Sequence, residues 1–301
     1  MRSGGPDVSV VIPAYRGGPL LRRAVQSMAG QSFESLEVLV VSDGSDDPMD
    51  DLEALDARVR VIRCEHRGVS AARNTGLLES RGRFVAFLDE DDLAMEGRIA
   101  AQFAALSDRP DAAMAHGQVQ VIDECGRQVG PLRGGPVTYP DMLRARFLHM
   151  TSLMVSRREA IVAGGFDALL ITGEDIDFQL RLAKDHAVVF VPEVLTRYRL
   201  HADNTRIDPL MAQQVIGPIL RAHRRWATQM QLPELVSAAA DGMRTNRRTN
   251  ATAAYRQAGQ ARRCGRIRDS ARYLVMSLRI DPRVTLKVAL RTAWDDLRRA
   301  G

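Results

Sequence analysis

The chain has 301 residues, of which 45% are hydrophobic and 26% are charged, and this length accommodates one large domain or one domain with an extension. No apolar run approaches the about 18 residues of a membrane-spanning helix, and the N-terminus lacks the apolar stretch of a secretion signal. Three cysteines are too widely spaced for a disulfide framework or a zinc motif, so we expect a cytoplasmic protein.

Charge is distributed unevenly along the chain. Residues 1–204 contain 23 basic and 30 acidic residues, a net charge of −7, whereas residues 205–301 contain 19 basic and 7 acidic residues, a net charge of +12. We therefore predict a domain over 1–204 and a basic extension over 205–301, with the boundary near Asn204. The acidic first part argues against nucleic acid as its substrate.

The first hundred residues alternate between two hydrophobic patterns. Short runs rich in β-branched and apolar residues predict strands at 8–12, 37–41, 59–63 and 84–88. Between them, apolar residues recur at intervals of three and four, which predicts helices. Alternating strands and helices indicate an α/β fold whose mostly parallel central sheet is covered by helices on both faces.

Polar sequence follows each of these four predicted strands. The segments are "PAYRGG", "SDGSDD", "CEHRGVSAARN" and "DEDD", in chain order. Ligands of such sheets bind at the carboxyl ends of the strands. The four segments should therefore meet at one edge of the sheet and form a site there.

The acidic segment at 89–92 suggests a metal. If the chain stays extended, Asp89 and Asp91 lie on one face and Glu90 and Asp92 on the other. Paired carboxylates suit a hard divalent ion such as Mg²⁺, which completes its coordination with water and phosphate oxygens. A solvated acidic loop or a helix N-terminus remains the alternative.

Residues 112–204 have a different pattern. We predict β-structure at 112–130 with a turn at 124–126, and a strand at 152–156. A helix over 173–185 begins with acidic residues, which the helix dipole favours. The segments "AVVFVP" and "VLTRYRLH" predict two further strands.

Seven motifs, taken together, carry a resemblance. "SVVIPAY", "VLVVSDGSDD", "GVSAARNTGL", "FVAFLDEDD", "GGFD", "GEDIDFQLRLA" and "YRLH" resemble the motif series of the family 2 inverting glycosyltransferases, which have the GT-A fold. The resemblance covers residues 7 to about 204. It implies metal-dependent transfer of a hexosyl or hexosaminyl group from a nucleotide-sugar donor, with a UDP-sugar expected, to a saccharide or lipid-linked acceptor in polysaccharide or glycoconjugate synthesis.

The resemblance also implies nucleotide-binding roles. Three residues at the end of the first strand would face the base, Asp43 would accept a hydrogen bond from it, and Gly68 would let the backbone approach closely. The remaining contacts would reach the ribose and diphosphate. The implied set is Pro13, Ala14, Tyr15, Asp43, Gly68, Arg73, Asn74 and Asp89. Alternatives are a helix-capping core aromatic for Tyr15, an Asx turn for Asp43 and a solvated helix face for Arg73 and Asn74.

By the same resemblance, Asp89 and Asp91 match the D-x-D motif that holds Mn²⁺ or Mg²⁺. His201 matches a histidine that adds a ligand or contacts the diphosphate in some family members, although a structural histidine is the alternative. Glu90 stands where a small residue is common, which leaves open whether it joins the site. Asp92 is expected to support the other acids.

The segment "GEDIDF" matches the motif that carries the general base. Asp175 would accept the proton of the acceptor hydroxyl, with Glu174 and Asp177 as its neighbours. Neighbouring carboxylates should raise the pKa of Asp175 above its ordinary value of about 3.9. The alternative, that the acids only cap the helix, applies better to Asp177.

The basic extension reads as four helices. In the last, the apolar side chains of Val284, Leu286, Val288, Leu290 and Trp294 form one face, with basic residues largely opposite. Such a helix suits an anionic membrane surface, as a peripheral contact at its inner face, or it packs on the catalytic domain. Basic and aromatic residues are not interleaved, so we expect no nucleic-acid partner.

Two other functions are compatible with parts of this pattern. One is a catalytically inactive nucleotide-sugar-binding or scaffold protein, which the presence of Asp89, Asp91 and Asp175 disfavours. The other is phosphoryl transfer through a carboxylate nucleophile. That chemistry needs an acid at the end of the first strand, where "PAY" stands.

Overall fold

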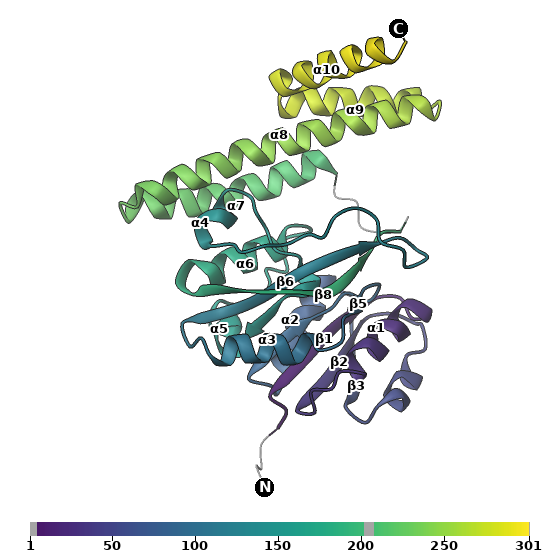
Figure 1. Cartoon of the computed structure of the whole chain (residues 1–301), viewed down its shortest axis with the longest axis vertical. Helices are drawn as coiled ribbons and strands as arrows, with labels where there is room; N and C mark the ends of the chain where they lie inside the picture. The colour runs from purple at the N-terminus through teal and green to yellow at the C-terminus, as the bar shows by residue number, and fades with distance from the viewer. Residues whose placement is uncertain (1–4, 202–207, 301) are drawn as a thin grey trace. The chain divides into compact units, whose positions relative to one another are not determined.

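The computed structural model describes residues 5–201 and 208–300 (Figure 1). The chain forms two compact units, one of Met1–Tyr139 with Phe147–Asn204 and one of Pro140–Arg146 with Thr205–Gly301. The predicted boundary near Asn204 lies outside the described residues. Residues 140–146, which the sequence placed in the first domain, group with the second unit.

The first unit is built on a mixed sheet. Its eight described strands run in the order β3-β2-β1-β4-β7-β6-β8-β5. Strands β1 to β4 are mutually parallel where they pair, β6 and β8 are parallel, and β5 and β7 run antiparallel to their neighbours. Their bounds are Val8–Ala14, Leu36–Asp43, Val59–Cys64, Phe84–Phe87, Leu93–Ala94, Ala112–Ile122, Met154–Ser156 and Ala187–Arg199. The four strands predicted in the first hundred residues are confirmed.

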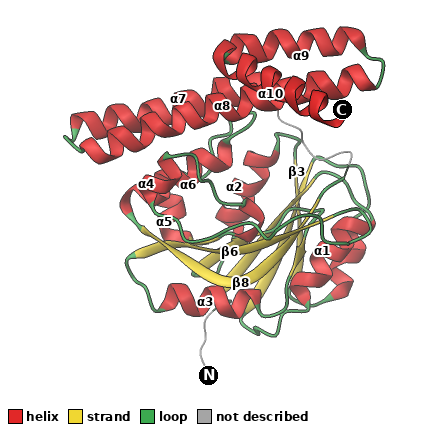
Figure 2. Cartoon of the chain, turned by 45° about the horizontal axis from the view of Figure 1, so that its top comes forward, coloured by secondary structure: helices red, strands yellow, loops and turns green. Residues whose placement is uncertain are grey.

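Helices cover both faces of this twisted sheet (Figure 2). The longer helices of the first unit are α1 Pro19–Ala29, α2 Val69–Glu79, α3 Arg98–Ser107 and α6 Glu174–Asp185. The short α5 is Arg157–Val162, with 3₁₀ turns at Asp50–Leu55 and Met150–Ser152. The α/β class predicted from the alternating patterns is confirmed.

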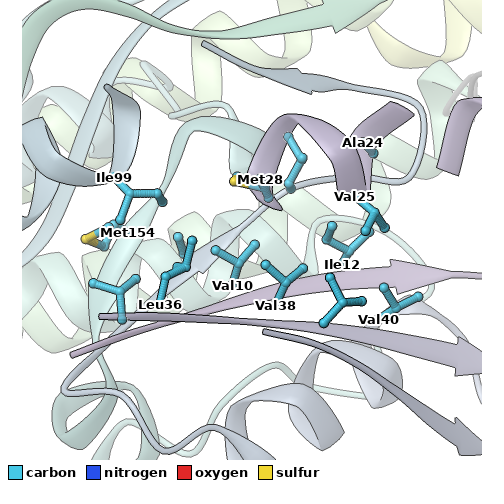
Figure 3. Packing of buried hydrophobic residues seen from close by; sticks show 14 of the residues in the cluster. Val10, Ile12, Ala24, Val25, Met28, Leu36, Val38, Val40, Ile99 and Met154 are labelled. Carbon is cyan, nitrogen blue, oxygen red and sulfur yellow. The ribbon is translucent and has the colours of Figure 1, made fainter. Parts of the chain in front are cut away.

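Alternate side chains along a strand point to opposite faces of the sheet, and each face packs against its own helices. Val10 and Ile12 of β1 pack with Val25 and Met28 of α1 and with Ile99 of α3 in one buried cluster (Figure 3). The intervening Val11 points to the other face, where α2 packs so closely that a Cβ on Gly76 would lie 2.3 Å from a Val11 methyl group. Both faces of the central strands are therefore buried, as their continuous apolar sequence requires.

One prediction about the strands is wrong. The segments "AVVFVP" and "VLTRYRLH" are not two strands, because they form the single long strand β8. The register with β6 shifts at this point, from Gly117 opposite Val191 to Gln118 opposite Val194. The shift leaves Pro192 and Glu193 outside the regular pairing. Since proline has no N–H to donate to the ladder, a bulge lets the strand continue past it.

The second unit is helical, as predicted. Its helices are α7 Pro209–Gln229, α8 Pro233–Arg263, α9 Ile267–Ile280 and α10 Pro282–Ala300, and the short α4 is Tyr139–Leu143. Residues 140–146 pack directly on α8, where a Cβ on Gly242 would lie 1.8 Å from the carbonyl oxygen of Leu143. No helix among the described residues is long and apolar enough to span a membrane.

The apolar face predicted for α10 is divided in the structure. Val284 packs against the buried cluster of α8 and α9, whereas Leu286, Leu290 and Trp294 are 58% to 64% exposed. Thr285 is buried instead, and its hydroxyl group hydrogen-bonds that of Ser277 at 2.6 Å. The neighbouring helices therefore bury only part of the predicted apolar face, and the rest of it is exposed.

Candidate active site

The loops that follow β1, β2, β3 and β4 lie at one edge of the sheet, since these strands are parallel neighbours. Contacts join the loops to one another. Glu90 accepts hydrogen bonds from the backbone N–H groups of Tyr15 and Arg16, both at 3.1 Å. The rings of Tyr15 and His66 are in contact as well. The predicted meeting of the strand ends is confirmed.

The four acids at 89–92 form a turn and not an extended segment. The N–H of Asp92 donates to the carbonyl of Asp89 at 3.2 Å, so the predicted alternation of side chains is wrong. A turn directs every carboxylate to a different partner. Asp89 accepts from Arg73 Nη2 at 2.9 Å, Glu90 from the β1 loop, Asp91 lies 2.8 Å from His201 Nε2, and Asp92 accepts from the N–H of Arg199 at 2.8 Å.

Burial makes ionisation of the carboxyl groups in this acidic turn less favourable. It raises the pKa of Glu90 to about 7, and it raises the pKa values of Asp91 and Asp92 as well. Charge repulsion from Asp89 adds to all three shifts, while His201 opposes the shift of Asp91. Excess negative charge of this kind favours a cation nearby.

The residues of the turn suit a divalent cation whose remaining coordination positions are filled by oxygen atoms of a bound ligand. Asp91 and His201 present an oxygen and a nitrogen donor side by side, and Asp89 is on the same turn. Among the described residues, no three His, Cys, Asp or Glu side chains are gathered as a complete metal cage. Mg²⁺ needs only one or two carboxylates when waters and phosphates supply the other ligands.

Arg73 connects the acidic turn to the start of α6. Its guanidinium is buried and lies 2.9 Å from both Asp89 and Glu174, over the ring of Phe166. Although burial opposes its charge, Asp89, Glu174 and Asp175 together raise the pKa of Arg73. The alternative of a solvated helix face is therefore wrong for this residue. Removing one partner of such a buried pair typically costs about 3–5 kcal/mol.

Asp175 lies in the first turn of α6, which begins after Gly173 in the left-handed conformation at φ 74°. The side chain is half-buried, and its Oδ1 accepts the N–H of Ile176 at 2.8 Å. Burial and then the charge of Glu174 raise the pKa of Asp175 to about 6, although Arg73 partly opposes them. The predicted upward shift is confirmed in direction, with burial as its main cause.

Asp177 has a structural task. It binds Arg181, whose Nη2 donates to the carbonyl of Gly165 at 2.7 Å and whose Nη1 donates to that of Ala163. These bonds hold the loop "GGFD" in place. Asp177 therefore acts through Arg181 and does not cap the helix, which was the alternative offered for it by the sequence.

Asn74 holds the same loop from α2. Its Nδ2 donates to the carbonyl of Phe166 at 2.7 Å, and its Oδ1 accepts the N–H of Phe166 at 2.8 Å. Phe166 in turn stacks on Phe178 with ring centroids 4.2 Å apart. Both ends of the amide are thus engaged by the protein, and the predicted contact of Asn74 with a nucleotide stays a prediction.

Asp43 ends β2 and shapes the loop after β3. Its Oδ1 accepts the N–H of Arg67 at 2.8 Å, and its Oδ2 accepts the N–H of Gly68 at 2.9 Å. Gly68, at φ 89°, immediately precedes α2 as its N-cap residue. Pro13 and Ala14 are the last residues of β1, beside Val41 and Ser42 of β2. These predicted nucleotide-binding residues are therefore all at the strand-end edge.

Sequence reasoning missed two contributors. Arg199, in the motif "YRLH", donates from Nε to the carbonyl of Asp91 at 3.1 Å and so braces the acidic turn from β8. His66, in "CEHRGVSAARN", lies between Asp43 and Tyr15. The position of His66 directly after a strand end was the available signal, because side chains there point toward the ligand edge.

Comparison with known proteins gives one family model. Residues 9–158 match the model described as glycosyl transferase family 2. An uncharacterized glycosyltransferase of Rickettsia felis is 26% identical over 209 residues, covering 67% of this chain and 34% of the relative. Uncharacterized glycosyltransferase MJ1057 of Methanocaldococcus jannaschii is 27% identical over 222 residues, covering 70% of this chain and 76% of the relative. The chain spans about a third of the length of the first curated relatives that it matches.

Solved structures also resemble this one. Residues 1–349 of S. aureus TarS, in complex with UDP-GlcNAc, superpose with a TM-score of 0.58 at 16% identity, covering 90% of this chain and 91% of that one. The same TarS fragment without that ligand gives 0.57 at 16% identity, covering 90% of each chain. At this identity the likeness concerns the fold, and it agrees with the GT-A architecture predicted from the motifs.

Proposed function

Since this chain belongs to glycosyl transferase family 2, we propose that it transfers a hexosyl or hexosaminyl group from a nucleotide-diphosphate donor to a hydroxyl group of a saccharide or lipid-linked acceptor, with inversion at the anomeric carbon. The observation that carries this proposal is the bridge of Arg73 between Asp89 and Glu174. The bridge joins the acidic turn, suited to a metal and diphosphate, to the turn that bears Asp175.

Asp175 is the general base of the proposed reaction. Its carboxylate takes the proton of the acceptor hydroxyl, which attacks the anomeric carbon while the nucleoside diphosphate leaves from the opposite side. A retaining mechanism of the glycosidase type would need a second carboxylate as nucleophile. Glu174, the neighbouring acid, is engaged by Arg73 at 2.9 Å. This arrangement favours a single displacement and hence inversion.

Asp89, Asp91 and His201 would hold the divalent cation, Mn²⁺ or Mg²⁺. When bound, such an ion neutralises charge on the leaving diphosphate as a Lewis acid. Tyr15, at the end of β1, and the loop that Asp43 shapes would take the nucleoside. UDP is the nucleotide that we favour, because the TarS fragment of the same fold was crystallised with UDP and with UDP-GlcNAc.

The proposal predicts metal-dependent binding of a nucleoside diphosphate. In a thermal-shift screen of UDP, GDP, ADP and their sugar derivatives, we expect one nucleotide to raise the melting temperature with Mn²⁺ and to lose this effect with excess chelator. A ligand at 100 times its Kd stabilises the folded state by about 2.7 kcal/mol, which such a screen detects easily. Stabilisation by no nucleotide, with or without metal, would contradict the proposal.

We further propose that the second unit associates peripherally with an anionic membrane surface. Residues 205–301 carry a net charge of +12. On α10, Leu286, Leu290 and Trp294 are exposed beside Arg291 and Lys287. An exposed apolar stripe flanked by basic residues is typical of helices that lie in the membrane interface. Each basic residue near an anionic surface contributes about 1 kcal/mol.

Replacing Leu286, Leu290 and Trp294 together by Ser should therefore weaken binding to vesicles. These side chains are mostly exposed, so the variant should fold normally. We expect co-sedimentation with phosphatidylglycerol vesicles to fall at low salt, and wild-type binding to decline as salt rises. A matched control replaces three exposed side chains of the first unit, Leu78, Val162 and Leu169, by Ser. Failure of the wild-type protein to co-sediment would show that the exposed stripe serves another purpose.

A further inference from the structure

The segment that leads into the 3₁₀ turn at Met150–Ser152 crosses from one unit of the chain to the other. Residues 140–146 belong to the second unit, whereas the chain from Phe147 onward belongs to the first. We call residues 140–148 the strap. Specific contacts hold the strap on each side of the crossing, and those on the first-unit side come from α6, the helix that carries Asp175.

The second-unit part of the strap is a short, closed turn. Met142 and Leu143 are fully buried. The turn ends with Ala145 in the left-handed conformation at φ 68°, where its N–H donates to the carbonyl of Met142 at 2.9 Å. The N–H of Arg146 donates to the carbonyl of Asp141 at 3.2 Å. This pair of bonds is the Schellman motif that closes a helix C-terminus. The backbone of the strap is therefore fixed where it leaves the second unit.

The strap is seated on α8 at Gly242. A Cβ on this glycine would lie 1.8 Å from the carbonyl oxygen of Leu143 and 3.2 Å from the backbone nitrogen of Ala145. Glycine lets the two backbones approach this closely because it has no side chain. It is otherwise unfavourable in a helix interior. The close seat of the strap is therefore the physical reason for glycine at this position.

On the first-unit side, Gln179 of α6 binds both backbone groups of Leu148. Its Oε1 accepts the N–H of Leu148 at 3.1 Å, and its Nε2 donates to the carbonyl at 3.2 Å. Both residues are buried. Two bonds to one residue fix its orientation as well as its position. Leu148 is only two residues after Arg146, a span of at most about 7 Å, so little slack separates the two holds.

The bonds of Gln179 act on the helix that carries the proposed base. Asp175 and Gln179 are four residues apart, so they lie one turn apart on the same face of α6. Two other contacts of α6, with Arg73 and through Arg181, are made within the first unit. The contact of Gln179 differs from these, because the chain continues from Leu148 directly into the second unit.

We propose that the strap makes the second unit a positioning element for the general base. Seated on Gly242 and bound by Gln179, the strap holds α6, and with it Asp175, in the geometry that transfer requires. Gln179 is then a positioning residue, because it acts through the helix. The effect on transfer rests on the proposed function. A misplacement of about 1 Å can lower a rate about 100-fold, so a small shift of α6 is enough.

Hydrogen–deuterium exchange of the full chain tests the strap without any ligand. In Gly242→Ala the added methyl group must displace the strap. We expect the amides of residues 176–183 in α6 to exchange about 5- to 150-fold faster than in the wild type, the range for loss of buried hydrogen bonds. Gly259→Ala, on the same helix, is the matched control, since its nearest neighbour would be 3.7 Å away. Unchanged exchange of α6 in Gly242→Ala would overturn the coupling.

Gln179→Met tests the contact from the first unit. Methionine keeps the length of the side chain but makes neither bond to Leu148. We expect hydrolysis of UDP-GlcNAc in Mn²⁺, with water in place of the acceptor, to fall about 10- to 100-fold. The calorimetric affinity for UDP should stay within about threefold of the wild type. Gln31→Met is the matched control, because Gln31 is also buried and donates to the backbone carbonyls of Ser27 and Met95, away from α6.

Wild-type hydrolysis in Gln179→Met, or an equal loss in Gln31→Met, would overturn the positioning role and leave the contact a contribution to stability alone. A parallel loss of UDP affinity in Gln179→Met would also overturn it, because the nucleotide site would then be the part affected. If the wild-type protein binds no nucleoside diphosphate, the proposed function fails. Exchange in Gly242→Ala still decides whether the strap couples the second unit to α6, so the two failures are distinguishable.

Discussion

Replacement of Asp175 by Asn should lower sugar transfer by about 10²- to 10⁴-fold, the usual contribution of a general base. The amide keeps the size of the carboxylate and an oxygen for the N–H of Ile176, but it cannot take a proton from the acceptor. Nucleotide binding should stay near the wild-type value, since the Asp175 carboxylate hydrogen-bonds the backbone of α6 and is not proposed to touch the metal or the base. Transfer rates and nucleotide affinity, measured on the same preparation, check the two halves of this expectation.

The raised pKa of Asp175 gives the wild-type enzyme a defined pH profile. A base with a pKa of about 6 is protonated and inactive at lower pH, so the rate should rise about tenfold per pH unit below pH 6 and level off above it. The residual activity of Asp175→Asn should lack this rise.

Asp167→Asn is the matched control for this change. Asp167 is exposed in the loop "GGFD", where its Oδ1 accepts the N–H of Leu169 at 2.9 Å, a bond that an amide oxygen can still make. We expect near wild-type transfer from it. Asp177 is a poorer control, because its loss would release Arg181 from the loop. Near wild-type turnover in Asp175→Asn would mean that the base lies elsewhere, with Glu174 as the next candidate.

The second large effect is expected at Asp91. Asp91→Asn should weaken nucleoside diphosphate binding in Mn²⁺ by at least about tenfold, because a charged ligand of the metal is lost together with its share of phosphate neutralisation, although the amide oxygen can still contact His201. Binding in excess chelator should already be weak in the wild type and should change little in the variant. Calorimetric titrations in both buffers measure the coupling between metal and nucleotide.

Glu90→Gln provides the comparison for Asp91. Its amide oxygen can still accept the N–H groups of Tyr15 and Arg16, and removal of its charge leaves Asp89 and Asp91 in place. We expect this variant to bind nucleotide within about threefold of the wild type. Equal wild-type affinity with Mn²⁺ and with chelator would refute the assignment of Asp89, Asp91 and His201 to a metal.

The parts of this fold that were predictable are those governed by local patterns. Continuous apolar runs such as "VSVVI" identify buried parallel strands, and the polar residues after them identify the ligand edge. Helices of the second unit follow from spacing and from prolines such as Pro233, which lies in the first turn of α8. These features depend on residues that are close together in the sequence, so the sequence alone is enough to predict them.

Features that depend on distant partners were not predictable. Asn74 and Phe166 are 92 residues apart, yet they make two hydrogen bonds, and nothing in either segment marks the pair. The same holds for Arg73 and Glu174, separated by 101 residues. The acidic run was taken as extended because alternation is the default after a strand. Its four different partners require a turn, and they come from β8, the segment just after β8, α2 and the β1 loop.

The measurement that tests inverting transfer most directly follows the anomeric configuration of the sugar released from the donor. In the absence of an acceptor, water takes the place of the acceptor hydroxyl, and proton NMR at early times identifies the first anomer before mutarotation. With an α-linked UDP-sugar and Mn²⁺, the single displacement assigned to Asp175 predicts that the β-anomer forms first. Release of the α-anomer first would contradict inversion and would require a second nucleophile in this site.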